Sequence, residues 1–165
     1  SKATYIIMVM MAFVLVVAGC SRVPSTQTPS ETPMANVSPT TAVSQLDLSG
    51  KGLTSVPSYV FDRRGLAELD LSNNRLMGAL PAEIRRLRDL RVLDASGNQM
   101  TGVPAEIGQL SNLVDLDLSG NKLTGLPLEL GNLQNLRRFD LRGNNISKQD
   151  LDAIRANLKN TEILE

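Results

Sequence analysis

Histidine and tryptophan are absent from this 165-residue sequence, and cysteine occurs once, as Cys20. Without histidine, a Ser-His-Asp or Cys-His nucleophile has no general base, so catalysis of that kind is excluded. A single cysteine forms no internal disulfide. Zinc sites draw mainly on cysteine and histidine, so the sequence offers almost no zinc ligands. We therefore expect no metal, no cofactor and no enzymatic activity.

An excess of positive charge is also missing, since 17 basic residues balance 17 acidic ones. Proteins that hold a nucleic-acid backbone need a surplus of lysine and arginine, so we expect no nucleic-acid partner. Aromatic residues are few, and beyond the N-terminal apolar segment only Tyr59, Phe61 and Phe139 remain. Because aromatic side chains commonly anchor tight interfaces, we expect binding that is weak or is strengthened by many anchored copies.

The N-terminal 20 residues combine a basic residue, an apolar run and small residues. Lys2 precedes an apolar run over residues 5–17, and Ala18 and Gly19 lie between this run and Cys20. The run is shorter than the roughly 20 residues that a membrane-spanning helix needs. This order is typical of a secretory signal peptide. The segment over residues 17–20, Val-Ala-Gly-Cys, resembles the lipobox of bacterial lipoproteins.

The resemblance to a lipobox implies that residues 1–19 are a lipoprotein signal peptide and that Cys20 is lipidated. Two or more acyl chains give a stable membrane anchor, so we expect an extracytoplasmic protein. Ser21 and Arg22 lack the acidic residue that is linked to inner-membrane retention in some Gram-negative bacteria. The outer membrane or cell surface is therefore slightly favoured. The alternative is an uncleaved N-terminal membrane helix with an incidental cysteine.

Residues 20–42 differ in composition from the segments on either side. After the cysteine, serine and threonine are frequent and prolines are spread through the segment, at Pro24, Pro29, Pro33 and Pro39. Such a sequence cannot bury enough apolar surface to fold. We expect a disordered, partly stiff tether between the membrane and a folded domain over residues 43–165.

A leucine-rich pattern recurs through the folded part of the chain. Each copy opens with the spacing apolar-x-x-apolar-x-apolar, as in Leu66, Leu69 and Leu71, and the copies begin at residues 43, 66, 90, 113 and 136. A polar residue, usually asparagine, follows; in the first four copies a proline comes next, and in most an apolar pair closes the unit. This pattern resembles the leucine-rich repeat family, and residues 76–81 are similar to the longer unit of plant receptor ectodomains.

The resemblance implies an α/β solenoid. Short parallel strands would form the concave face, and short helical or 3₁₀ segments would form the convex face. One unit buries too little to fold alone, whereas a stack of five can fold. Asparagine can both donate and accept hydrogen bonds, so it can satisfy backbone groups in buried turns. We expect such a structural ladder at Asn74, Asn98, Asn121 and Asn144.

The two ends of the repeat array deviate from the pattern, as capping units do. Arg63 replaces a closing leucine, and we expect Phe61 or the Arg63 stem to fill that gap. At the other end, residues 147–150 are similar to a capping box. Leu151, Ile154 and Leu158 then lie on one helical face. We therefore expect a C-terminal capping helix over about residues 147–160.

The residue between the two strand leucines is aspartate in all five units. Strand side chains alternate in direction, so these carboxylates should lie on the concave face, with neighbouring strands about 4.8 Å apart. We expect an acidic surface that turns basic at its C-terminal end. Its candidate ligand-binding residues are Asp47, Asp70, Asp94, Asp117, Asp140, Glu68, Asp115, Arg138 and Arg142.

Two interpretations of this acidic face stay open. It could attract a cationic partner, which would be a basic protein segment, amino groups of a cell-envelope polymer, or loosely held Ca²⁺. Alternatively, aspartate is simply the solvated residue that such units carry. Paired carboxylates also catalyse glycoside hydrolysis, but a solvated ladder without aromatic neighbours argues against that chemistry.

The sequence therefore predicts a monomeric, lipid-anchored leucine-rich repeat module. It would bind an unidentified protein or envelope polymer through its concave face, without catalysis. Two alternatives remain: a structural, self-associating envelope protein, and a regulator of a secreted enzyme.

Overall fold

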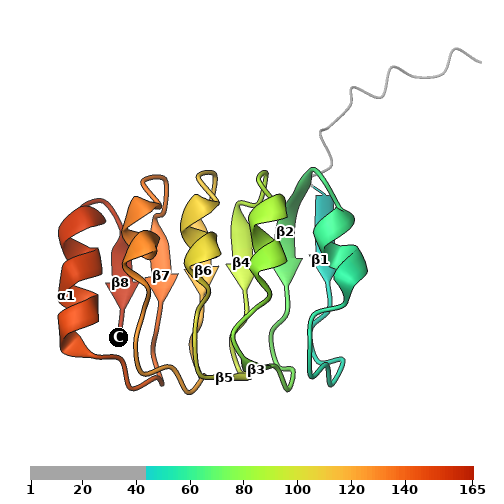
Figure 1. Cartoon of the computed structure of the whole chain (residues 1–165), viewed down its shortest axis with the longest axis horizontal. Coiled ribbons are helices and arrows are strands. Elements are labelled where there is room, and N and C mark those ends of the chain that lie inside the picture. Colours follow the sequence, from blue (N-terminus) through green and yellow to red (C-terminus); the bar gives the residue numbers. More distant parts are fainter. Residues whose placement is uncertain (1–43) are drawn as a thin grey trace, which may run out of the picture. The chain divides into compact units, whose positions relative to one another are not determined.

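The computed structural model describes residues 44–165, and these residues form a stack of repeated units (Figure 1). The predicted signal peptide, Cys20 and the tether lie outside the described residues. No helix among residues 44–165 is long and apolar enough to cross a membrane.

One parallel sheet runs through the whole stack. Its strands lie side by side in chain order, so every connection leads to the next strand (Figure 1). The second apolar residue of each unit stays in register across the sheet, for example Leu93 beside Leu116 and Leu116 beside Phe139. The six strands are β1 (Ser44–Asp47), β2 (Leu66–Asp70), β4 (Val92–Asp94), β6 (Asp115–Asp117), β7 (Arg138–Asp140) and β8 (Glu162–Leu164).

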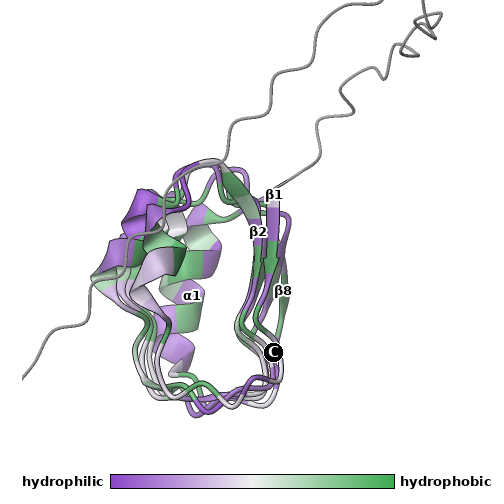
Figure 2. Cartoon of the chain, turned by 90° about the vertical axis from the view of Figure 1, so that its right-hand side faces the viewer, coloured by the Kyte–Doolittle hydropathy of each residue, from purple (hydrophilic) through white to green (hydrophobic). Residues whose placement is uncertain are grey.

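Short 3₁₀ helices cover the opposite side of each of the first four units (Figure 2). Each one directly follows a proline with extended backbone, at Pro57, Pro81, Pro104 and Pro127. Proline suits this place because its φ is fixed and it lacks the N–H that a helix start leaves unpaired. The 3₁₀ helices are η1 (Ser58–Asp62), η2 (Ala82–Arg86), η3 (Ala105–Gln109) and η4 (Leu128–Asn132).

A second, two-stranded parallel sheet lies at the lower edge in Figure 1. Its strands are β3 (Met77–Gly78) and β5 (Gln99–Met100). β3 belongs to the unit that the sequence marks as longer, residues 76–81. The extra backbone pairing therefore coincides with the departure from the generic repeat.

The hydrophobic core fills the space between the main sheet and the 3₁₀ helices. Figure 2 shows apolar residues in both layers, and on the helices they lie on the side that faces the sheet. The strand leucines and the closing apolar pairs of the second to fourth units are buried, and Phe139 is the largest fully buried side chain. Phe61 is 4% exposed whereas Arg63 is exposed, so the phenyl ring and not the arginine stem occupies the first unit's gap. The predicted fold class is confirmed.

The C-terminal end differs in two respects from the prediction. Helix α1 (Lys148–Asn157) forms and buries Leu151 and Ile154, but Ser147 makes no side-chain capping hydrogen bond. The Asp150 carboxylate instead accepts the Leu126 N–H at 3.2 Å, so it is directed toward the preceding unit. The chain then returns to the sheet as strand β8, beyond the five expected units. Leu164 O accepts the Leu141 N–H at 2.7 Å.

Candidate recognition site on the sheet surface

The side chains between the strand leucines point to the solvent face of the sheet, hereafter the concave face. Each aspartate of this column ends its strand and accepts, through Oδ1, the backbone N–H two residues further on. These N···O distances are 2.8–3.1 Å. Such a bond is typical of aspartate in a turn. Each carboxylate of the column therefore has a structural role, because it stabilises the turn that follows its strand. The five aspartates are Asp47, Asp70, Asp94, Asp117 and Asp140.

The asparagine ladder lies directly behind these turns. Each Oδ1 accepts an N–H of the preceding unit at 3.0 Å. Each Nδ2 donates to a carbonyl of the preceding unit and to the carbonyl three residues before it in its own unit, at 2.8–3.0 Å. In the first three rungs a second carbonyl of the same unit also accepts, at 3.1–3.3 Å. Backbone groups enclosed by the turns are thus satisfied, and successive units are fixed at one spacing. The residues are Asn74, Asn98, Asn121 and Asn144.

Charges at the C-terminal end of the concave face pair with one another. The Arg138 guanidinium lies 3.1 Å from Asp115, 3.3 Å from Asp117 and 2.6 Å from Asp140. Arg142 lies 2.6 Å from Asp140, whose side chain is fully buried. The hydrogen bond from Arg142 lowers the pKa of the Asp140 carboxyl below its ordinary value of 3.8. These five residues, three acids and two bases, form a closed network and leave a net charge of −1.

The N-terminal end of the concave face holds four carboxylates, at Asp47, Glu68, Asp70 and Asp94, hereafter the acidic quartet. None forms an ion pair with a residue in the described range. Glu68 accepts a hydrogen bond from Gln45 Nε2. The quartet lines a shallow hollow of about 330 Å³. Four like charges with no cationic partner make this hollow the most acidic part of the face.

The hydroxyl of Ser49 donates to Asp47 at 2.6 Å, and this bond lowers the pKa of the Asp47 carboxyl. The lowered pKa keeps the Asp47 carboxylate ionised at neutral pH. Among the described residues, no group of acidic side chains is arranged to hold a metal ion.

The nine residues expected to form one ligand surface thus separate into two groups. The acidic quartet remains available, whereas Asp115, Asp117 and Asp140 are occupied by the two arginines. The sequence carried a signal for this pairing that was missed. Arg138 lies directly beside Asp115 in the parallel register, and opposite charges on neighbouring strands attract. The turn-closing role of the aspartates was also missed, although a glycine or asparagine three residues later indicates a tight turn.

The fold and the hydrogen-bonded ladders define a class of protein: a solenoid scaffold built from units of 23 or 24 residues. Family models agree with this class. The model described as "Leucine rich repeat" matches residues 41–100, and the model described as "Leucine Rich repeats (2 copies)" matches residues 88–129 and 111–160. Together they span residues 41–160. The chain belongs to the leucine-rich repeat family.

Relatives are found in bacteria and plants. A solved leucine-rich repeat protein of Leptospira interrogans is 42% identical, with a TM-score of 0.63 over 67% of this chain and 28% of its own. A plant peptide hormone receptor, RGFR1 in complex with RGF2, is 38% identical, with a TM-score of 0.63 over 73% of this chain and 20% of its own. Receptor-like protein 32 of Arabidopsis thaliana is 44% identical over 42% of this chain. The chain spans only 8% of that relative.

Proposed function

We propose that the chain is a lipid-anchored recognition module whose acidic quartet binds a cationic segment of a protein partner, without catalysis. One observation carries the choice of site: the quartet keeps four carboxylates without an ion pair around one hollow, while the other concave carboxylates are paired with Arg138 and Arg142. Solved leucine-rich repeat relatives in complexes with protein or peptide ligands support a protein partner. An envelope polymer with amino groups is the other cationic candidate.

The geometry also indicates how the quartet would recognise its partner. Neighbouring strands are about 4.8 Å apart. Same-face side chains of an extended segment are about 6.6 Å apart, so the long, flexible side chains of lysine or arginine would have to bend to meet successive carboxylates. Charge complementarity of this kind sets specificity and association rate more than affinity. Exposed ion pairs contribute about 0.2–1 kcal/mol each, so four of them contribute about 0.8–4 kcal/mol and change affinity by roughly 4-fold to several hundred-fold.

The proposed membrane anchor rests on residues 17–20, which lie outside the described residues. Anchoring would compensate for a weak site, since many copies on one membrane raise the effective concentration of binding sites. The absence of histidine supports a non-catalytic role, because a nucleophile would lack its usual base.

The test compares three forms of the full chain in mild detergent, each used to capture proteins from the envelope fraction. The first is wild type. The second carries Asp→Asn or Glu→Gln at the acidic quartet, changes that keep the Oδ1 acceptor of each turn but remove its charge. The matched control removes four acids from the helices of the convex side, at Glu83, Glu106, Glu129 and Asp152.

We expect one partner to be retained by the wild type and the control and lost by the quartet variant. With that partner purified, the quartet variant should bind about 10-fold or more weakly. Equal binding by all three forms would contradict the proposed site. Equal losses in both variants would show that only net charge matters.

A further inference from the structure

A second charged surface follows the edge of the sheet where the 3₁₀ helices lead into the strands, the upper edge in Figure 1. Two hollows of about 340 and 590 Å³ lie along it and share Asp89 in their linings, so they are adjacent. We call the two hollows together the arginine trough. Its basic residues are Arg64, Arg86, Arg88, Arg91 and Arg137.

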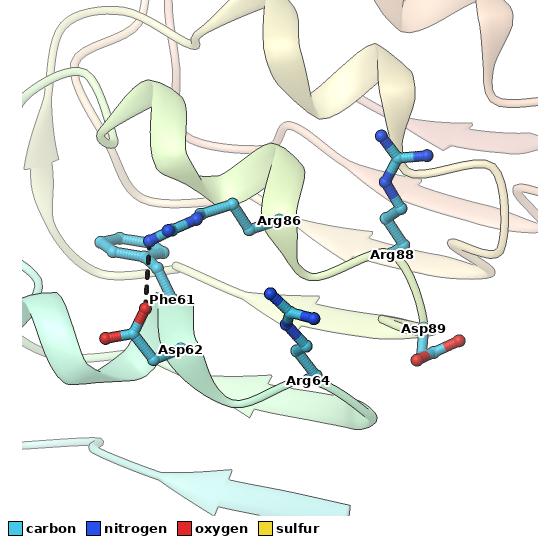
Figure 3. A pocket seen from close by; sticks show the side chains of 6 residues that line it. All are labelled: Phe61, Asp62, Arg64, Arg86, Arg88 and Asp89. Carbon is cyan, nitrogen blue, oxygen red and sulfur yellow. Dashed lines mark hydrogen bonds and ion pairs between the residues drawn. The ribbon is translucent and has the colours of Figure 1, made fainter.

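Positive charge in the arginine trough is largely uncompensated. Five arginines face two acids, Asp62 and Asp89, so the net charge is 5 − 2 = +3. Arg86 lies 3.1 Å from Asp62. The other four arginines form no ion pair with any residue in the range 44–165. Figure 3 shows Arg64 and Arg88 extending from neighbouring loops, while only Arg86 reaches the Asp62 carboxylate.

The repeat fixes the spacing of these guanidinium groups. Arg64 and Arg88 occupy equivalent positions in adjacent units, and Arg91 and Arg137 occupy equivalent positions two units apart. Since adjacent parallel strands are about 4.8 Å apart, the backbones of Arg64 and Arg88 lie about one strand spacing apart along the edge, and those of Arg91 and Arg137 about two. Guanidinium groups bind phosphate oxygens through two parallel hydrogen bonds. Such a row fits a flexible chain that carries phosphate groups at short intervals.

We propose that the arginine trough binds a linear, phosphate-bearing polyanion. The lining argues against an apolar protein partner and against nucleic acid. Its only aromatic residue, Phe61, is 4% exposed, so it offers neither a site for a protein's apolar anchor nor a platform on which nucleic-acid bases could stack. This inference is independent of the acidic quartet and of the proposed anchor.

The test measures binding of fluorescently labelled inorganic polyphosphate to the full chain in nonionic detergent, by anisotropy at several salt concentrations. The trough variant is Arg64→Gln, Arg88→Gln and Arg91→Gln, whose side chains make no hydrogen bond within the described structure. The matched control removes three charges from the opposite edge, with Lys51→Gln, Arg75→Gln and Lys122→Gln. Mixed micelles with anionic phospholipid serve as competitors, and zwitterionic micelles are their control.

We expect the wild type and the opposite-edge control to bind polyphosphate with an affinity that falls as the salt concentration rises. Each lost phosphate contact should reduce the slope of log affinity against log salt by about 1, so the trough variant should lose about 3. Its affinity at low salt should fall on the order of 10-fold or more. Absence of wild-type binding, or equal losses in both variants, would overturn the proposal. Displacement by anionic micelles at a lower phosphate concentration than free polyphosphate requires would assign the trough to lipid headgroups instead.

Discussion

Replacement of Asn98 by alanine offers a direct test of how the solenoid holds its concave face in place. Asn98 is 6% exposed. Its Oδ1 accepts the Leu76 N–H at 3.0 Å, and its Nδ2 donates to Leu71 O and Ala95 O, each at 3.0 Å. The substitution removes these three bonds and a fourth, from Nδ2 to Ser96 O at 3.1 Å, but the backbone groups are not affected equally.

The neighbouring rungs of the ladder decide the magnitude. Leu71 O keeps a hydrogen bond from Asn74, and Ala95 O keeps one from Asn121. The Leu76 N–H has no second partner among the described residues, and leaving a buried donor unpaired costs about 1–3 kcal/mol. With the weakened carbonyl bonds added, we expect Asn98→Ala to lower the free energy of unfolding by about 2–4 kcal/mol.

Two further substitutions sharpen this prediction. Asn98→Asp keeps the size and the acceptor but loses the donors, so it should be at least as destabilising as alanine. Asn144 is only partly buried, so water can replace its bonds and Asn144→Ala should cost about 1–2 kcal/mol. The exposed Asn132 makes no side-chain hydrogen bond, and Asn132→Ala should change stability by less than about 0.5 kcal/mol.

Urea denaturation of the full chain in mild detergent, followed by circular dichroism, measures these differences. The decisive comparison is Asn98→Ala against Asn132→Ala. If both variants unfold within about 0.5 kcal/mol of the wild type, the ladder does not satisfy backbone groups that water cannot reach, and the reasoning is refuted.

Three other predictions concern packing and charge. Gly108→Ala should lower the free energy of unfolding by about 1–3 kcal/mol, because the added Cβ would lie 2.3 Å from a backbone oxygen of η4. Gly102→Ala is the control in the same urea assay and should be neutral, because its added Cβ would lie 3.8 Å from the nearest atom. Because the hydrogen bond from Arg142 lowers the pKa of Asp140 in the folded state, the ionised carboxylate stabilises the fold above pH 3.8, and this stabilisation is lost as the pH falls through the folded-state pKa. When the free energy of unfolding is measured against pH, Asp140→Asn should therefore lose less stability in acid than the wild type. Ile154→Ala, at a fully buried position of the capping helix, should cost about 2–5 kcal/mol, and a loss below 1 would contradict that role.

Much of the fold follows from the sequence because the repeat states the same rule five times. The alternating strand leucines predict the sheet, and proline before each 3₁₀ helix predicts where the convex layer begins. Strand β8 escaped prediction because its unit keeps only one apolar position of three. The register of Phe139 with Ile163 places Asn160 and Glu165 where earlier units have leucine or alanine. Tertiary pairing with β7, not local pattern, forms that strand.

The sequence predicted where the carboxylates of the candidate site lie, but not which of them form ion pairs. Alternation places every aspartate on the concave face, yet it cannot say which carboxylates an arginine will neutralise. That depends on the conformation of the Arg138 side chain, whose guanidinium lies close to both Asp117 on the neighbouring strand and Asp140 on its own strand. The arginine trough was not predicted, since its residues come from helix-to-strand loops outside the leucine pattern. The balanced charge totals, 17 basic and 17 acidic residues, give no sign of the trough. A net charge of zero does not tell where on the surface the positive and negative residues gather.

The measurement that tests the proposed anchored module most directly is the intact mass of the expressed protein with membrane fractionation, comparing wild type with Cys20→Ser. We expect the wild type in the membrane fraction, with a mass equal to residues 20–165 plus acyl groups, and we expect the Cys20→Ser chain to stay unprocessed. An unprocessed, unacylated wild type would contradict the proposed lipid anchor. Cys20 would then have no role in anchoring, and the partner of the acidic quartet could lie on either side of the membrane.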